Sequence, residues 1–226
     1  MSRLILAGGT DVGEVAFFSC DDLPDKPGED AIEALAAAGR ALRLETRAEG
    51  PYLLHLYVDQ PAPPEIEAWL DANGTLEVDF ITESGRIGFG GAESAYAGFE
   101  PNPAVRTDAE IPPGEYRAVA FYTNYPDERL EEEIEARLGK AGTVKVNRPV
   151  NIGIAAAILV VSQLILGVAD TPWYFAGAAA VAAGAWLWIR RIKRTREYRE
   201  LVAAKRDVER RFPSVVIKLV RQETAA

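Results

Sequence analysis

The histidine at position 55 is the residue whose type best suits general acid–base chemistry near neutral pH. It is the single histidine of the 226-residue chain and lies inside an apolar run, YLLHLYV, at 52–58. Asp59 follows it closely, and a carboxylate near an imidazole could complete a hydrolase-type site. No G-x-S-x-G motif accompanies them. His55 and Asp59 are therefore the catalytic candidates, and a histidine hydrogen-bonded within a sheet is the preferred interpretation.

Residue types that bind metals or cofactors do not cluster in this sequence. One histidine and one cysteine, Cys20, cannot build a zinc site from His and Cys ligands or a disulfide within the chain. The glycine-rich segment GGTDVGE at 8–14 matches neither G-x-G-x-x-G nor a phosphate-binding P-loop. Its acids, Asp11 and Glu14, lack EF-hand spacing, so we expect a tight turn with solvated carboxylates. No cofactor and no metal are expected.

The elements that must position these residues belong to a mixed α and β domain over 1–148. Strands are predicted over 4–7, 12–18, 41–46, 52–58, 75–81, 86–89 and 115–123, and helices over 29–38, 65–70 and 127–138. Residues 90–113 are rich in Gly, Ala and Pro and are expected to form a loop. Segments beginning at Tyr52 and Tyr116 share the order Tyr, apolar strand, Pro, acidic helix, which fits either two related strand–helix units or the ordinary likeness of such units.

Two uncharged apolar runs, at 150–169 and 171–189, are separated by Asp170 alone. At about 1.5 Å per residue, roughly 20 helical residues cross the ~30 Å hydrocarbon core of a bilayer. The sequence therefore predicts a transmembrane helical hairpin over 149–189. The alternative is a buried hairpin of a soluble protein.

Aromatic and basic residues at the ends of the second run fit the two membrane–water interfaces. The expected interface residues are Trp173, Tyr174, Trp186, Trp188, Arg190 and Arg191. Positive charge precedes the first run and follows the second, whereas the turn carries only Asp170. Because positive charge favours the cytoplasmic side, we expect a multi-pass protein of a bacterial inner membrane with both termini in the cytoplasm.

Ser162 and Gln163 are the strongly polar side chains well inside a predicted span. An interhelical hydrogen bond, within the hairpin or in an oligomer, is the preferred interpretation. A polar lining of a conduit is the alternative. Ionisable residues usually mark ion paths, and both predicted spans lack them.

Charge divides the chain into an acidic and a basic part. Residues 1–148 hold 13 Lys and Arg against 28 Asp and Glu, and residues 149–226 hold 12 against 6. The acidic head is repelled by nucleic acid, so no nucleic-acid partner is expected, whereas the basic part favours the lipid bilayer. Residues 214–220 are β-prone, and because a lone strand is unstable we expect them to join the head's sheet or a neighbouring chain.

The expected fold is an acidic α+β cytoplasmic head at 1–148, a two-helix transmembrane hairpin at 149–189, and a basic cytoplasmic helix with a short C-terminal strand at 190–226. These features favour a membrane-anchored, non-enzymatic binding or regulatory protein whose acidic head engages a protein partner or a second copy of the chain. An immunity-type protein against a toxin is one version. The alternatives are a membrane-tethered small-molecule sensor, with a cleft between the two strand–helix units, and a hydrolase that uses His55.

Overall fold

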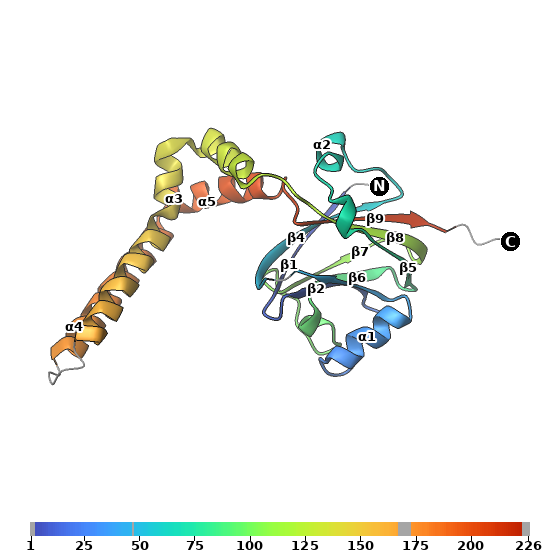
Figure 1. Cartoon of the computed structure of the whole chain (residues 1–226), viewed down its shortest axis with the longest axis horizontal. Helices are drawn as coiled ribbons and strands as arrows, with labels where there is room; N and C mark the ends of the chain where they lie inside the picture. The colour runs from blue at the N-terminus through green and yellow to red at the C-terminus, as the bar shows by residue number, and fades with distance from the viewer. Residues whose placement is uncertain (1–2, 47, 167–172, 223–226) are drawn as a thin grey trace. The chain divides into compact units, whose positions relative to one another are not determined.

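A β-sandwich and a helical unit make up the structure, a computed structural model that describes residues 3–46, 48–166 and 173–222. The sandwich comprises Met1–Tyr125 and Phe212–Ala226, and the helical unit comprises Pro126–Arg211 (Figure 1). The expected mixed α+β class, with a sheet-rich N-terminal region followed by helices, is confirmed. The sequence-based domain limits are 148 and 189. In the structure, residues 126–148 belong to the helical unit and residues 212–226 belong to the sandwich.

The strands of the sandwich form two sheets, with the orders β1-β4-β9-β8-β5 and β3-β2-β6-β7. All pairings are antiparallel except that of β4 with β9. The strands are β1 Leu4–Thr10, β2 Glu14–Ser19, β3 Ala41–Glu45, β4 Gly50–Val58, β5 Leu76–Thr82, β6 Arg86–Gly91, β7 Arg106–Glu110, β8 Gly114–Tyr122 and β9 Val215–Arg221.

Alternating apolar side chains of both sheets meet between them and form the main core. Leu54, Leu56 and Val58 of β4 belong to it, as the period-two alternation of this run predicts. From the other sheet, the Phe17 ring of β2 packs on Phe80 with ring centroids 4.8 Å apart. The core therefore fixes which face of β4 looks inward and leaves His55 on the other face.

The outer faces of both sheets are covered by short helices. Ile32 and Leu35 of α1 (Glu29–Ala37) pack on the outer face of β2 and β3, together with residues around the 3₁₀ turn η2 (Ala92–Ser94). Ile66 of α2 (Pro64–Glu67) packs over the outer face of β4 and β9. A second 3₁₀ turn, η1 (Ala72–Gly74), precedes β5.

The sandwich contains the same arrangement of strands twice. In β1–β4 and again in β5–β8, the first and fourth strands belong to one sheet and the second and third to the other. Corresponding strands have equal lengths of 7, 6, 5 and 9 residues. Tyr52 and Tyr116 occupy equivalent positions in β4 and β8, and each hydroxyl donates a hydrogen bond to a carbonyl four residues earlier. The two halves meet at the β2–β6 pair, and β9 lies between them in the other sheet.

The C-terminal strand lies in the middle of its sheet, between β4 and β8. Of the two expectations for 214–220, addition to the head's sheet is confirmed. The expected loop over 90–113 is wrong in part, because β7 pairs with β6 there. Its sequence, RTDAE, carries no apolar alternation that would have revealed a strand.

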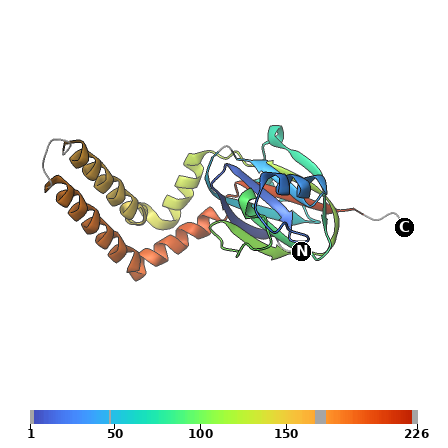
Figure 2. The same ribbon diagram turned by 90° about the horizontal axis from the view of Figure 1, so that it is seen from below.

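The helical unit contains α3 (Asp127–Leu166), α4 (Trp173–Arg194) and α5 (Arg196–Glu209). Two helices merge in α3 across a kink at Gly139, which has φ 71° and ψ 160°. α3 and α4 lie side by side (Figure 2), and α5 packs against α3. The Thr195 hydroxyl caps α5 by accepting a hydrogen bond from the Tyr198 amide.

Candidate functional site

His55 lies in the middle of β4 with no exposed surface, opposite Ile5 of β1 and Val216 of β9. Its Nδ1 is 3.5 Å from the Tyr57 hydroxyl. Asp59 is exposed at the end of the strand, about 13 Å further along an extended chain. Its carboxylate accepts a hydrogen bond of 2.8 Å from the Arg221 amide. The structure thus gives the two catalytic candidates separate surroundings, one buried and one exposed, and the hydrolase hypothesis remains a prediction.

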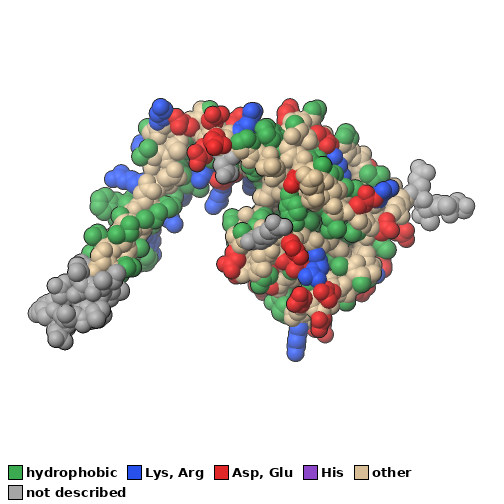
Figure 3. Space-filling model, viewed as in Figure 1, with side chains coloured by type: hydrophobic (Ala, Val, Ile, Leu, Met, Phe, Trp, Pro, Cys, Tyr) green, Lys and Arg blue, Asp and Glu red, His purple; other side chains and the backbone are tan. Residues whose placement is uncertain are grey.

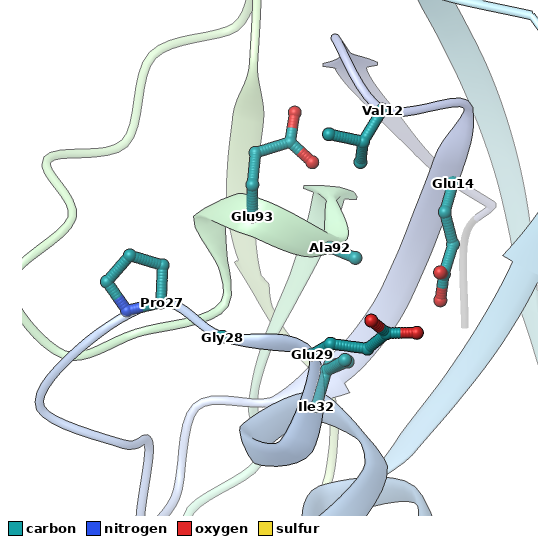
Figure 4. Close-up of a pocket in the computed structure, with 8 residues that line it drawn as sticks. All are labelled: Val12, Glu14, Pro27, Gly28, Glu29, Ile32, Ala92 and Glu93. Atoms are coloured by element: carbon teal, nitrogen blue, oxygen red, sulfur yellow. The ribbon is translucent and has the colours of Figure 1, made fainter.

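A cavity of about 420 Å³ opens between the two halves of the sandwich, within the size range of small-molecule sites. The first half contributes the β1–β2 turn and the start of α1, and the second contributes η2. Val12, Ile32 and Ala92 provide apolar surface. Figure 4 shows the three carboxylates of the wall, with Glu14 and Glu29 extending toward one another and Glu93 facing Val12. We call this cavity the inter-repeat pocket.

The β1–β2 turn, which forms part of the pocket wall, is held by a left-handed glycine and by side-chain hydrogen bonds. Gly13 has φ 72°, a left-handed conformation that side chains rarely adopt. The Thr10 hydroxyl accepts hydrogen bonds from the Val12 and Glu14 amides. Glu93 reaches across from η2 and accepts a hydrogen bond of 3.0 Å from the Asp11 amide. The tight turn expected for GGTDVGE is present, and it also holds one side of a cavity.

The carboxylates of the pocket differ in how they are neutralised. Glu14 accepts two hydrogen bonds from the Arg43 guanidinium, of 2.5 and 2.9 Å, and Glu33 accepts a third of 3.0 Å. These bonds, with those that Arg43 donates to Glu14 foremost, raise the pKa of Arg43, so the ion pair stays charged. Within the described part of the chain, Glu29 has no ionic or hydrogen-bonding partner for its carboxylate. The pocket therefore favours a positively charged group near Glu29.

Arg106 fixes the segment that carries Glu93. Its side chain is only 3% exposed and pairs with Asp108 through bonds of 2.6 and 3.0 Å. The same guanidinium donates to the Ser94 and Tyr96 carbonyls at 2.9 and 3.3 Å. Because a buried charge is costly unless fully paired, this network holds η2 in one position.

Cys20 lies beside this network, 3.5 Å from Arg106 Nη2. Burial, reinforced by the negative charge of Asp108 and opposed by Arg106, raises the pKa of the Cys20 thiol to about 11. Because the thiolate is the reactive form, this raised pKa lowers the reactive fraction of Cys20 at neutral pH.

Two of the predicted interface tryptophans lie on the surface of α4, with Trp186 57% and Trp188 56% exposed. Arg190 Cζ is 5.0 Å from the Trp186 ring centroid, and Arg148 Cζ on α3 is 5.9 Å from that of Trp188. Arg191 is exposed in the last turns of the same helix. Arg148 stands at the start of the apolar run of α3, and Trp188 stands near the basic end of α4. Their contact therefore places these two ends next to each other, at the same height along the two helices.

The remaining residues predicted for the hairpin either form no hydrogen bond between α3 and α4 within the described part of the chain or have side chains outside it. Ser162 is exposed on α3 and has no hydrogen bond to α4 among the described residues. The side chains of Gln163, Trp173 and Tyr174, and the turn at 167–172, lie outside the described residues. Within 3–46, 48–166 and 173–222, one helical stretch, Glu128–Ser162, is long and apolar enough to cross a membrane by length and composition.

The inter-repeat pocket was not predicted from the sequence. Asp11 and Glu14 stood out as turn acids, but Glu93 lies 82 residues from Asp11. The signals that were present are the glycine-rich turn and the Pro27-Gly28 start of α1. Neither reveals that a third segment completes the cavity.

Comparisons with known proteins identify no family for this chain. No family model matches it, and no curated protein matches it. Among solved structures, a chain described as "Crocagin biosynthetic gene J" matches with 20% sequence identity and a TM-score of 0.38, over 58% of this chain and 80% of that chain. A similarity this low supports no conclusion on fold or function, so the function must be argued from the site itself.

Proposed function

We propose that the chain is a membrane-anchored, non-enzymatic binding protein. In this proposal α3 and α4 cross a bilayer as a hairpin, and the sandwich engages a protein partner through its acidic surface on the cytoplasmic side. An immunity-type protein that neutralises a toxin is one specific form of this proposal.

The observation that carries the proposal is the exposed apolar surface of α3 and α4, which Figure 3 shows on its visible face. Its large exposed side chains include Ile154, Ile158, Leu159, Val161 and Leu187. Only 11% of the most apolar window of α3 is buried, whereas the core helix of a soluble protein is mostly buried. Apolar surface of this extent is unfavourable in water, and the hydrocarbon core of a bilayer would remove it from water.

The dimensions and flanking charges fit a bilayer. From Arg148 to the end of α3 at Leu166 the helix is about 27 Å long, close to the ~30 Å hydrocarbon thickness. Arg148, Trp186, Trp188 and Arg190 share one level, and tryptophan and arginine are typical of membrane interfaces. Lys140 and Lys145 lie on the same side of that level along the chain, which favours a cytoplasmic location for both connections to the sandwich.

The sandwich supports the binding role through its charge. It holds 10 Lys and Arg against 23 Asp and Glu, a net charge of −13, whereas the helical unit has +4. Such a surface attracts basic partners and is repelled by anionic lipid.

Membrane fractionation of the full chain tests the anchor. We expect it to stay in the pellet after alkaline carbonate washing, to dissolve in detergent, and to lose its sandwich to protease in inverted but not right-side-out vesicles. A monodisperse full chain in the supernatant without detergent would contradict the proposal. A partner captured from the detergent extract should be released by salt, because the attraction is electrostatic. Salt-independent capture would contradict recognition through the acidic surface.

The inter-repeat pocket favours a second candidate function, a membrane-tethered sensor of a small cationic molecule. Its apolar wall and the unpartnered Glu29 suit an amine that carries a short hydrocarbon part. A thermal-shift screen of amines on the detergent-solubilised chain tests this function. We expect Glu29→Gln to abolish the shift and Glu65→Gln, an equal charge change in the first turn of α2, to preserve it. A shift that survives Glu29→Gln would exclude the pocket.

A further inference from the structure

A small cavity at the junction of α4 and α5 is distinct from the inter-repeat pocket and lies wholly within the helical unit. Its volume is about 170 Å³, below the 300–1,000 Å³ typical of drug-sized ligands. It is lined by Lys145, Arg148, Ile192, Thr195, Glu197, Tyr198 and Leu201. We call it the junction cavity, and its size suits one compact polar group.

The basic side chains of the junction cavity are not neutralised equally. Arg148 has no carboxylate partner among the described residues, and its one recorded contact is with the Trp188 ring. Lys145 Nζ is 2.5 Å from Glu197 Oε1, and these side chains are 53% and 65% exposed. Exposed ion pairs are weak, so a better acceptor can draw Lys145 away. The first turn of α5 lies at the same cavity, and the N-terminal end of a helix attracts negative charge.

The surroundings of the cavity point to the source of the anion. Arg148 lies at the level of the exposed Trp188, next to the apolar surface of α3 and α4. Residues 190–199 add six Lys and Arg against one Glu. In the proposed anchor, this level is where phospholipid headgroups lie.

We propose that the junction cavity binds the phosphate group of an anionic phospholipid. The Arg148 guanidinium donates two hydrogen bonds to the phosphate oxygens, a geometry that suits arginine particularly well. Lys145 turns from Glu197 to the same phosphate and adds a second positive charge. The inference rests on the proposed membrane anchor but goes beyond it, because it assigns a lipid class and the residues that select it.

Native mass spectrometry of the full chain in detergent micelles tests the site. The micelles are titrated with phosphatidylglycerol, with phosphatidylcholine and with inorganic phosphate. We expect phosphatidylglycerol to bind about tenfold more tightly than phosphatidylcholine, because the net negative charge of its headgroup is not cancelled by a choline. Equal affinities for the two lipids would overturn the proposal. Retention of inorganic phosphate as tight as that of phosphatidylglycerol would assign the cavity to free phosphate and would also overturn it.

Matched variants separate the cavity from a diffuse basic surface. Arg148→Gln should weaken phosphatidylglycerol binding about fivefold, whereas Arg199→Gln, the same charge change outside the cavity, should leave it within about twofold. Glu197→Gln should tighten binding about fivefold because it frees Lys145, and Glu200→Gln should change it by less than about twofold. Equal effects within each pair would overturn the assignment to the junction cavity.

The opposite signs of the Arg148 and Glu197 variants guard against an unfolding artefact, since a loss of structure weakens binding in both. Failure of this inference is also distinguishable from failure of the anchor. A chain that leaves the membrane pellet contradicts the anchor, whereas a chain that stays there and binds both lipids equally contradicts only the lipid site.

Discussion

The Tyr125 hydroxyl donates a hydrogen bond of 3.0 Å to the Phe212 carbonyl, and the centroids of their rings lie 5.2 Å apart. These residues mark where the chain leaves the sandwich after β8 and where it returns before β9. The Thr123 amide extends the pairing by donating to the Ser214 carbonyl at 3.2 Å. The 86 residues of the helical unit are therefore inserted between two hydrogen-bonded neighbouring strands.

Replacing Pro126–Arg211 by a linker of about five residues rich in Gly and Ser should leave a folded, soluble sandwich, because hairpin connections of that length are common. A cooperative thermal transition by circular dichroism and a monomeric elution volume would check it. Aggregation of this shortened protein would show that the sandwich depends on the helical unit.

Truncation after Arg211 should have the opposite effect, because it removes β9 from the middle of a sheet. Val215, Val216 and Ile217 have no exposed surface, and Leu219 is 1% exposed. Each such side chain contributes about 1.5–3 kcal/mol, so the sum approaches a whole domain's stability of about 5–15 kcal/mol. We expect rapid proteolysis of the truncated chain, and resistance equal to that of the full chain would contradict the central role of β9.

Ile158→Arg tests whether α3 lies in hydrocarbon. Ile158 is 61% exposed and lies about 15 Å beyond Arg148, near the middle of the proposed span. An arginine there costs about 2.5–3.5 kcal/mol in a bilayer but within about 0.5 kcal/mol at a water-exposed position. We expect a sharp fall in the membrane-inserted fraction.

Val144→Arg is the matched control on the same helix. Val144 is 66% exposed and precedes Arg148, outside the proposed span. Its replacement should leave the inserted fraction unchanged. Two variants that behave alike would show that the level of Arg148 does not mark the interface.

Asp21 links the end of β2 to the β5–β6 turn, and this role predicts a dependence of stability on pH. Its carboxylate accepts hydrogen bonds of 2.8 Å from the Ser19 hydroxyl and of 2.7 and 3.1 Å from the Glu83 and Ser84 amides. Partial burial alone would raise the pKa of Asp21, but the bonds from Ser84, Ser19 and the backbone outweigh it and hold the pKa well below its usual range. This stabilisation is present above the unfolded pKa of about 3.9 and is lost as the pH falls toward the folded pKa.

Asp21→Asn should therefore lower the free energy of unfolding by about 1–3 kcal/mol at neutral pH, and the difference from the wild type should shrink below pH ~3. Urea unfolding followed by tryptophan fluorescence measures both values. Asp22→Asn is the control, because that carboxylate is 79% exposed and its ion pair with Arg40 lies at the surface. A pH-independent difference for Asp21→Asn would contradict the depressed pKa.

Cys20 should react slowly with iodoacetamide. With its pKa raised to about 11, the thiolate fraction at pH ~8 is about a hundredfold below that of an unperturbed cysteine. Because the chain has one cysteine, the mass gained on alkylation reports this site alone. Equal rates in native and urea-unfolded protein would show that Cys20 is accessible and ionised.

Local patterns were enough to predict much of the fold. The apolar run YLLHLYV identified β4, and the apolar run at 214–220 identified β9. β7 escaped prediction because its side chains are mostly polar. The pairing of β9 with β4, 161 residues apart at Leu54 and Val215, depends on tertiary contacts that no local window contains.

The contrast between local patterns and tertiary contacts also explains which candidate site residues the sequence revealed. Trp186, Trp188, Arg190 and Arg191 stood out because the composition changes abruptly from apolar to basic at the end of the second apolar run. The inter-repeat pocket did not, because Glu14, Glu29 and Glu93 come from separate elements and each alone resembles an ordinary surface acid. Arg106 was also missed, since a buried arginine is recognised by its partners rather than by its neighbours in sequence.

Because the helical unit is inserted between β8 and β9, a single proteolytic cut in it does not release the sandwich. After one cut anywhere in the helical unit, the N-terminal fragment still holds β9 through backbone hydrogen bonds to β4 and β8, so the fragments stay associated. Shedding an intact sandwich requires two cuts, one on each connecting segment. Limited digestion should therefore release a two-piece product, the larger piece ending near Tyr125 and the smaller beginning near Phe212.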